Sequence, residues 1–188
     1  MKFLIISGNP KQDGLCKALE DAIARGARDG GAEVKTVTLE RLSRCQVCGD
    51  GWGSCAREHT CVLGGDGFDA LQETVRASDA FCFITPVYWG EVSEHMKGFL
   101  DRLRRCENIH NGNGALSGKS VLLACSPGGT GNGLLSALEQ LDRFCRHTGA
   151  VIFDYLAQNR WSAPYKQAAA YEAAKALASG VEPWRPEA

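Results

Sequence analysis

A regular alternation of short apolar runs with longer helical patterns constrains the fold most strongly. The runs are rich in branched and aromatic side chains and are short enough to be buried strands. Strands that alternate with helices predict a parallel sheet with helices on both faces. The predicted strands are 2–7, 33–39, 80–86, 119–126 and 151–157, and the predicted helices are 14–28, 68–77, a segment capped by Ser93, 133–147 and 165–178.

Five such strands fit the doubly wound order 2-1-3-4-5 in a three-layer α/β sandwich. Ligands of such sheets bind beyond the carboxyl ends of the strands, where the strand order reverses. The loops after the first, third and fourth strands are therefore the candidate site. The chain has 188 residues, and we expect a single domain over 1–188 with a cysteine-rich loop insertion at about 44–67.

The loop after the first strand leads directly into a helix N-terminus and consists of small and polar residues. Helix N–H groups attract an anion there, and Lys11 adds a positive charge. The loop matches neither G-x-x-x-x-G-K-[ST] nor G-x-G-x-x-G, which disfavours nucleoside triphosphates and dinucleotides. A single phosphate monoester, as in FMN, fits better. An ordinary turn between strand and helix remains the alternative.

Two further loops place aromatic and glycine residues at the same edge. Tyr88 and Trp89 stand beside Gly90 directly after a buried strand, and they suit an isoalloxazine ring. Residues 126–133 contain four glycines, which indicates close backbone approach to a flat group. The alternatives are that the aromatic pair belongs to the core or a subunit interface, and that the glycine-rich loop is flexible and binds nothing.

Four cysteines crowd between positions 45 and 61 with the spacing C-x2-C-x6-C-x5-C. Four thiolates in one loop can converge on a metal. A [4Fe–4S] cluster, a zinc site made by four cysteines or by three with His59, and four free thiols all stay open. Trp52, inside this loop, either covers a flavin or partner subunit or has a packing role. The candidate metal ligands are Cys45, Cys48, Cys55 and Cys61.

Several stretches resemble the NAD(P)H-dependent FMN reductase and iron–sulfur flavoprotein branch of the flavodoxin-like superfamily. They are 7–11, 85–90, 93–102 and 128–131, and the resemblance covers roughly the first 150 residues. The segment Pro-Val-Tyr-Trp-Gly, followed by the helix with Phe-Leu-Asp-Arg, is its most specific part. The resemblance implies a flavodoxin-like fold, and it favours iron–sulfur over zinc in the cysteine loop, although the gap before the third cysteine is longer here than in the family.

The resemblance also implies FMN bound non-covalently, with its phosphate in the first loop and its ring against the third and fourth. Family members often have Thr or Ser where Leu15 or Cys16 stands, which leaves backbone N–H groups to bind phosphate. The flavin carries the chemistry, so no catalytic side chain is predicted, and His95 and Glu91 are interpreted as structural or solvated. The implied FMN contacts are Ser7, Asn9, Lys11, Gly14, Leu15, Cys16, Pro86, Val87, Tyr88, Trp89, Gly90, Ser126, Gly128, Gly129, Thr130 and Gly131.

The implied reaction is hydride transfer from NADH or NADPH to flavin N5 and then to an acceptor. The implied assembly is a homodimer or homotetramer with the flavin near a subunit interface. One alternative is an iron–sulfur flavoprotein-type electron carrier that ferredoxin reduces. Another is a non-enzymatic flavodoxin-like binding or sensor protein.

The net charge, the apolar runs and the number of cysteines limit which kinds of partner and cellular location the sequence favours. A formal net charge of −1 gives no electrostatic case for nucleic acid or an anionic membrane, and it argues against a strongly acidic electron shuttle. The apolar run at the N-terminus is too short for a signal peptide, and no apolar run is long enough to span a bilayer. Nine cysteines, an odd number, do not predict a disulfide framework. We therefore expect a cytoplasmic protein.

Overall fold

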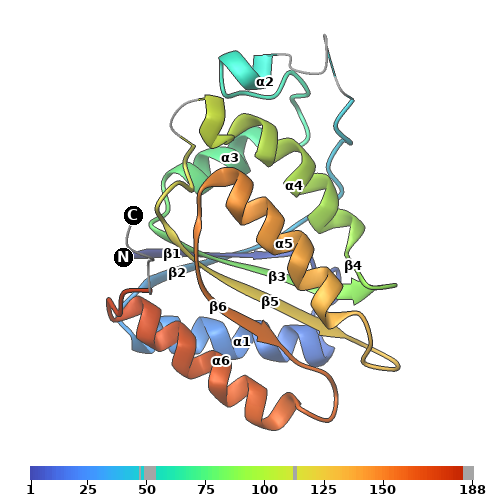
Figure 1. The fold of residues 1–188 in the computed structure, drawn as a ribbon, viewed down its shortest axis with the longest axis vertical. Helices are drawn as coiled ribbons and strands as arrows, with labels where there is room; N and C mark the ends of the chain where they lie inside the picture. Colours follow the sequence, from blue (N-terminus) through green and yellow to red (C-terminus); the bar gives the residue numbers. More distant parts are fainter. Residues whose placement is uncertain (47, 49–53, 112–113, 184–188) are drawn as a thin grey trace.

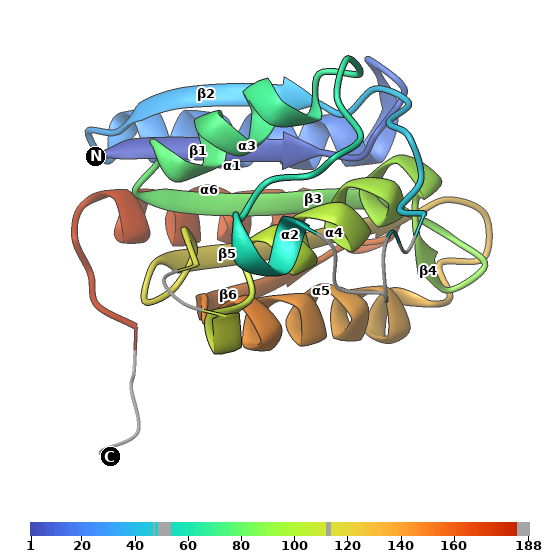
Figure 2. The same ribbon diagram turned by 90° about the horizontal axis from the view of Figure 1, so that it is seen from above.

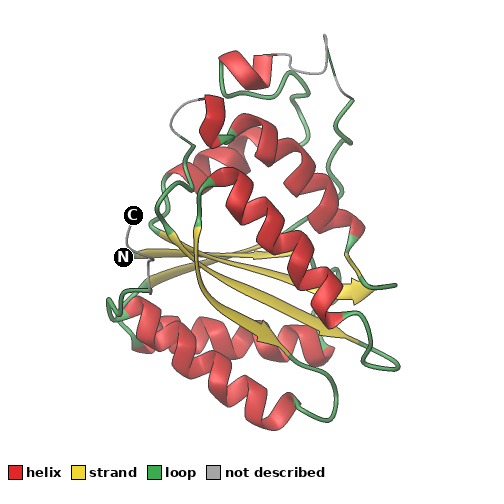
Figure 3. Ribbon diagram, in the orientation of Figure 1, coloured by secondary structure: helices red, strands yellow, loops and turns green. Residues whose placement is uncertain are grey.

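The computed structural model describes residues 1–46, 48, 54–111 and 114–183, which form one sheet flanked by helices (Figure 3). The elements are β1 (Lys2–Ser7), α1 (Gly14–Asp29), β2 (Glu33–Thr38), α2 (Ser54–Arg57), α3 (Phe68–Arg76), β3 (Ala80–Tyr88), β4 (Glu91–Val92), α4 (Glu94–Cys106), a 3-10 turn (Ile109–Asn111), β5 (Ser120–Pro127), α5 (Leu134–Thr148), β6 (Val151–Ala157) and α6 (Ala163–Ala178).

The sheet is parallel in the order β2-β1-β3-β5-β6. This is the predicted order 2-1-3-4-5 once the short strand β4 is left out of the numbering, so the flavodoxin-like prediction is confirmed. The strand register aligns Ser7 with Ile84, and Pro86 with Ser126. The carboxyl ends of β1, β3 and β5 therefore meet at one edge of the sheet.

Helices cover both faces of the sheet, as Figures 1 and 2 show. Helices α1 and α6 lie on one face, and α3, α4 and α5 lie on the other. Each face has its own apolar cluster. The central strand β3 is buried from Ala80 to Val87, because it has a strand on either side and helices above and below. That burial explains why its sequence is a continuous apolar run rather than an alternating one.

The third predicted strand ends two residues too early. The structure continues β3 to Tyr88 because β4 returns antiparallel to it, pairing Val87 with Val92 and Tyr88 with Glu91. The hairpin turns at Trp89 and Gly90, whose φ angles are 54° and 81°. Positive φ at both central residues makes a type I′ turn, which matches the twist of the paired strands.

Helix α1 packs directly against α6 through glycine. A Cβ added to Gly26 would lie 2.1 Å from the carbonyl oxygen of Tyr171, so no larger residue fits without moving backbone. Helices α1 and α6 therefore lie side by side on one face of the sheet (Figure 1).

The cysteine-rich insertion is described only in part. Residues 47 and 49–53, and Trp52 with them, lie outside the described residues. The described part contains α2, which lies beyond the face of the molecule formed by α4 (Figures 1 and 2). Among the described helices, none is long and apolar enough to cross a membrane. The cytoplasmic location stays a prediction.

Candidate functional site

The first loop is folded back on itself by Asn9. The buried Asn9 side chain donates from Nδ2 to the Lys11 carbonyl at 2.8 Å, and its Oδ1 accepts from the Lys11 N–H at 3.2 Å. Helix α1 then begins at Gly14, and the preceding Asp13 makes no side-chain capping bond. The first N–H groups of α1 are thus left without a carboxylate cap, which is the arrangement an anion prefers.

Ser93 ties the first loop to the third. Its N–H donates to Thr85 Oγ1 at 2.9 Å, and its hydroxyl donates to the Gly8 carbonyl at 2.7 Å. The same hydroxyl accepts from the N–H of Met96 at 3.2 Å and caps α4. The predicted cap is confirmed. One residue therefore joins the loop after β1, the carboxyl-terminal half of β3 and the start of α4.

The third loop in turn contacts the fourth. Ser136 at the start of α5 donates to the Gly90 carbonyl at 2.7 Å. Gly133 has a φ of 84°, and a Cβ there would lie 2.5 Å from the Cα of Gly90. The three loops chosen from the sequence are therefore brought together at one edge. The glycine spacing of the fourth loop is explained in part by this contact between two backbones.

The loop after β6 also reaches this edge, which sequence reasoning missed. Arg160 donates to the Gly129 carbonyl, and its guanidinium lies 4.9 Å from the centre of the Trp161 ring. The Trp161 ring packs against Gly131, where a Cβ would lie 2.8 Å from it. The available signal was the polar and aromatic segment Gln-Asn-Arg-Trp directly after a predicted strand.

Two buried polar atoms at this edge have no hydrogen-bond partner among the described residues. They are Ser126 Oγ at the end of β5 and Gln158 Oε1 after β6. Gln158 is fully buried and donates from Nε2 to the Leu15 carbonyl at 2.6 Å. Buried polar atoms are rarely left unpaired, so these two atoms mark a place for a polar ligand. With the α1 N-terminus and the glycine loop, they fit a phosphorylated planar group such as FMN.

The predicted residues of this edge differ in burial. Ser7, Cys16, Pro86 and Val87 are buried, while Tyr88 is half-exposed. Burial raises the pKa of Cys16 to about 12, with smaller contributions from Glu20 and Cys125, so its thiol is neutral near pH 7. The exposed predicted residues are Lys11, Gly14, Tyr88, Trp89, Gly128, Gly129 and Thr130.

Trp89 does not belong to the core, which removes one of the two alternatives raised for it. Its side chain is fully exposed, at 103%, and its φ of 54° is unfavourable for a residue with a large side chain. Leu135, next to Ser136, is 82% exposed on the same rim. Backbone strain under an exposed aromatic ring is typical of a functional position.

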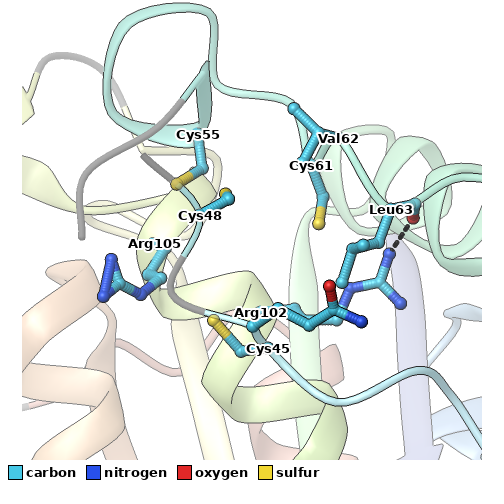
Figure 4. A pocket seen from close by; sticks show the side chains of 9 residues that line it. Cys45, Cys48, Cys55, Cys61, Val62, Leu63, Arg102 and Arg105 are labelled. Atoms are coloured by element: carbon cyan, nitrogen blue, oxygen red, sulfur yellow. Dashed lines mark hydrogen bonds between the residues drawn. The ribbon is translucent and has the colours of Figure 1, made fainter. Parts of the chain in front are cut away.

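The four cysteines of the insertion line a small cavity that is partly open to solvent (Figure 4). Cys55 is buried, and the other three are half-buried. This cavity is lined by Arg102 and Arg105 in the carboxyl-terminal half of α4, whereas Ser93 caps the start of that helix. The cavity is lined by Cys45, Gln46, Cys48, Cys55, Cys61, Val62, Leu63, Arg102 and Arg105.

Arg102 holds the two ends of the cysteine loop together. Its fully buried guanidinium pairs with Asp66 and donates to the carbonyl oxygens of Ser43 and Leu63. It also lies 4.0 Å from the centre of the Phe68 ring. Ser43 precedes the first cysteine by two residues and Leu63 follows the last by two, so one side chain closes the loop that carries all four thiols.

The residues around the cavity shift the pKa of Cys55 in opposing directions. Burial raises the pKa of Cys55, the Arg105 charge lowers it, and Cys48, Cys61 and Cys45 raise it. The mutual effect of the four thiols reflects their common cavity. His59 is not among the lining residues, and its Nδ1 bonds the Cys106 carbonyl at 2.9 Å, which disfavours a site of three cysteines with His59.

The model of the NADPH-dependent FMN reductase family matches residues 1–161. The chain belongs to this family. Membership confirms the predicted family, and FMN-dependent oxidoreduction is the activity that the family name implies.

Curated relatives of this FMN reductase family member are named iron–sulfur flavoproteins. That of Methanosarcina thermophila is 34% identical over 137 residues, covering 71% of this chain and 66% of the relative. One from Archaeoglobus fulgidus is 32% identical over 105 residues, covering 55% of this chain and 46% of the relative. The chain therefore spans less than two thirds of the length of these relatives.

Solved structures share the fold at low sequence identity. A flavone reductase superposes with a TM-score of 0.70 at 16% identity, covering 96% of this chain and 63% of that one. An NADH:FMN oxidoreductase superposes with a TM-score of 0.66 at 16% identity, covering 98% and 91%. An archaeal flavodoxin superposes with a TM-score of 0.61 at 14% identity, covering 96% and 99%. At this level of identity, the likeness concerns the fold alone.

Among the residues that the structure describes, no three Cys, His, Asp or Glu side chains are placed as ligands of a single metal ion. The four cysteines of this FMN reductase family member nevertheless line one cavity.

Proposed function

We propose that this chain binds FMN at the edge formed by the loops after β1, β3, β5 and β6, and that it is an NAD(P)H-dependent flavin oxidoreductase. The unpartnered, buried Ser126 hydroxyl carries the proposal, because it marks a polar contact that the folded chain does not make itself. FMN, when bound, supplies the hydride chemistry.

The residues of the chain orient and enclose the cofactor. The backbone N–H groups from Gly14 to Cys16 at the start of α1 hold the phosphate, with the Lys11 charge nearby. Pro86 to Gly90 and Ser126 to Gly131 contact the ring, and Gln158 Oε1, which has no partner among the described residues, is available to the same ligand. Arg160 and Trp161 brace the glycine loop from outside.

Binding measurements test the phosphate site. Purified protein is titrated with FMN and with riboflavin, and the quenching of flavin fluorescence is followed. The missing phosphate weakens riboflavin binding by about tenfold or more, equivalent to about 1.4 kcal/mol. Anaerobic mixing with NADPH or NADH then bleaches the flavin absorbance of the loaded protein. A protein that cannot be loaded with FMN refutes the proposal and leaves the binding or sensor alternative.

Ser126→Ala separates a ligand contact from a structural one. Its hydroxyl has no hydrogen-bond partner in the described part of the chain, so the variant keeps the thermal stability of the parent, while FMN binding weakens about threefold to tenfold. Ser120→Ala, at the opposite end of β5, is the matched control and leaves both quantities unchanged. Equal FMN affinity in the two variants would remove Ser126 from the site.

We further propose that the four cysteines hold an iron–sulfur cluster. Four soft donors around one cavity and the named iron–sulfur relatives support it. After anaerobic reconstitution, iron, sulfide and zinc are quantified. Cys61→Ala loses the iron, whereas Cys106→Ala, buried nearby but outside the cavity lining, keeps it. Bound zinc without sulfide would refute the cluster. A cluster-loaded protein reduced by ferredoxin and not by NADPH would favour the electron-carrier alternative.

We propose that the chain forms a homodimer or homotetramer through the rim that carries Trp89, Tyr88 and Leu135. Exposed apolar side chains grouped on one rim are typical of an interface between copies. Light scattering coupled to gel filtration gives the mass of the parent and of Trp89→Gly, which also relieves the left-handed strain. A monomeric parent, or an unchanged mass in the variant, contradicts this interface.

A further inference from the structure

A groove between α4 and α5 has more positive than negative side chains along it. Lys97, Arg104 and Arg143 line this α4–α5 groove, and Asp101 is the one carboxylate among its described lining residues. Asp101 pairs with both Lys97 and Arg104, so one negative charge is shared between two positive ones. Arg143 pairs with Glu139. The groove therefore keeps an excess of positive charge, which attracts an anionic group.

The ion pairs of the groove lie at the surface, so a ligand can replace them. The side chains of Lys97, Arg104 and Arg143 are each at least 40% exposed. Exposed ion pairs contribute little free energy, because water screens the charges and two long side chains must be held still. A phosphate monoester carries about two negative charges near pH 7 and can accept bidentate bonds from arginine, so it competes well with a single carboxylate.

The inner side of the α4–α5 groove is apolar. Val92, Leu100 and Phe144 line it, and all three are buried. The groove has a volume of about 260 Å³, enough for part of a ligand rather than for a whole one. An aromatic base can pack on these side chains while a phosphate attached to it lies among the positive charges. The groove thus suits a phosphorylated nucleoside.

The α4–α5 groove meets a second one, which opens beside the loops of the proposed flavin site. This loop groove has a volume of about 450 Å³ and is lined by Pro10 of the first loop and Tyr88 of the third. Val92 and Lys97 line both grooves, so the two adjoin near the start of α4. From Lys97 to Arg104 the helix rises about 10 Å, so the joined grooves suit an elongated ligand.

The two grooves differ in charge. Glu91 and Glu94 line the loop groove, whereas arginines line the α4–α5 groove. A matching ligand is therefore neutral or cationic at the end near the flavin site and anionic at its far end. A nicotinamide dinucleotide has this polarity, because its nicotinamide ring is uncharged when reduced and cationic when oxidised. Only NADPH also carries a 2′-phosphate on its adenosine.

We propose that the joined grooves bind the nicotinamide donor with its adenosine 2′-phosphate between Arg104 and Arg143, so that the protein selects NADPH over NADH. The inference rests on the proposed reductase function, to which it adds the place of the donor and the residues that select it.

Rapid mixing of the FMN-loaded protein with each donor measures this selection. The dependence of the anaerobic bleaching rate on donor concentration gives the Kd of NADPH and of NADH. The parent binds NADPH at least about tenfold more tightly, and Arg104→Gln and Arg143→Gln each lower this ratio about threefold to tenfold, because each removes a charged contact to the phosphate. Arg146→Gln is the matched control, since Arg146 is an exposed arginine of α5 outside the lining residues of both grooves, and it keeps the ratio.

A second measurement does not require reduction of the flavin. Calorimetry compares the binding of adenosine 2′,5′-bisphosphate with that of AMP. The bisphosphate binds more tightly to the parent and to Arg146→Gln, and it loses this advantage in Arg104→Gln and Arg143→Gln.

The outcomes distinguish this inference from the proposed function. An FMN-loaded parent that neither donor bleaches refutes the reductase function and the donor site together. Bleaching with equal affinity for NADPH and NADH refutes the donor site alone and leaves the reductase function in place. A loss of selection in Arg146→Gln equal to that in Arg143→Gln has the same consequence, because the charge of the whole helix would then act rather than the groove.

Discussion

Replacing Arg102 by Met tests whether one buried side chain closes the cysteine loop. Arg102 is 1% exposed and joins Ser43, Leu63 and Asp66, which are separated from it by 36 to 59 residues in the sequence. Met keeps much of the aliphatic volume over Phe68 but removes every donor. The Asp66 carboxylate and the Leu63 carbonyl then lose their shared partner.

Breaking a buried ion pair by removing one partner costs about 3–5 kcal/mol. The lower end applies here, because Asp66 keeps 16% of its side-chain surface and can still reach water. For a chain of this length each kcal/mol lowers the melting temperature by about 2–4 °C, so we expect a loss of at least about 6 °C. The loss accompanies a lower iron content, since the cysteine loop is no longer closed.

Thermal unfolding followed by circular dichroism measures the first effect, and iron analysis measures the second. Arg104→Met is the matched control, because Arg104 is 40% exposed and its ion pair with Asp101 is worth little. We expect the control to lie within about 0.5 kcal/mol of the parent. Equal melting temperatures for the two variants would refute the assignment of Arg102 as the residue that closes the loop.

Three further predictions concern other parts of the fold. Burial raises the pKa of Asp66, but its hydrogen bonds and the Arg102 charge outweigh this effect and lower the pKa to about 2. The ionised carboxylate therefore contributes about 2 kcal/mol to the free energy of unfolding above pH 4, and acid unfolding curves show this contribution lost as the pH falls toward 2. Gly26→Ala destabilises by at least about 1–3 kcal/mol in urea because of the Tyr171 carbonyl, whereas Gly98→Ala, with open space, stabilises by about 0.5–1 kcal/mol. Ser93→Ala lowers the free energy of unfolding by about 1–2 kcal/mol and weakens FMN binding, because it removes both the α4 cap and the bond to Gly8. An FMN affinity equal to that of the parent would show that Ser93 stabilises the helix without contributing to the site.

The strands were predictable because buried strands consist of short runs of apolar, branched and aromatic residues. The last strand was predicted over the same residues that β6 occupies, and the four helices predicted with both bounds, α1, α3, α5 and α6, begin and end within two residues of prediction. The short helix α2 was not predicted. The hairpin at Trp89 was not predicted, because two-residue turns of this type usually carry Asn, Asp or Gly first. The tertiary contact of Gly90 with Gly133 and Ser136 favours a turn that the local sequence does not.

The candidate site was predicted where it depends on topology alone. Parallel strands bring their carboxyl ends to one edge, so the loops after β1, β3 and β5 could be chosen from the sequence. The contribution of Gln158, Arg160 and Trp161 was missed because their partners, Leu15, Gly129 and Gly131, are distant in the sequence. No periodicity or spacing records such a contact.

By itself, the sequence determined the α/β architecture and the edge of the sheet at which the candidate loops meet, because hydrophobic periodicity and the alternation of strands with helices can be read from the chain. It also determined that four thiols stand close together in one loop. Only the tertiary structure decided that these thiols surround one cavity. Arg102, on the later helix α4, closes this loop. Its ion pair with Asp66 forms only once α4 packs on the sheet.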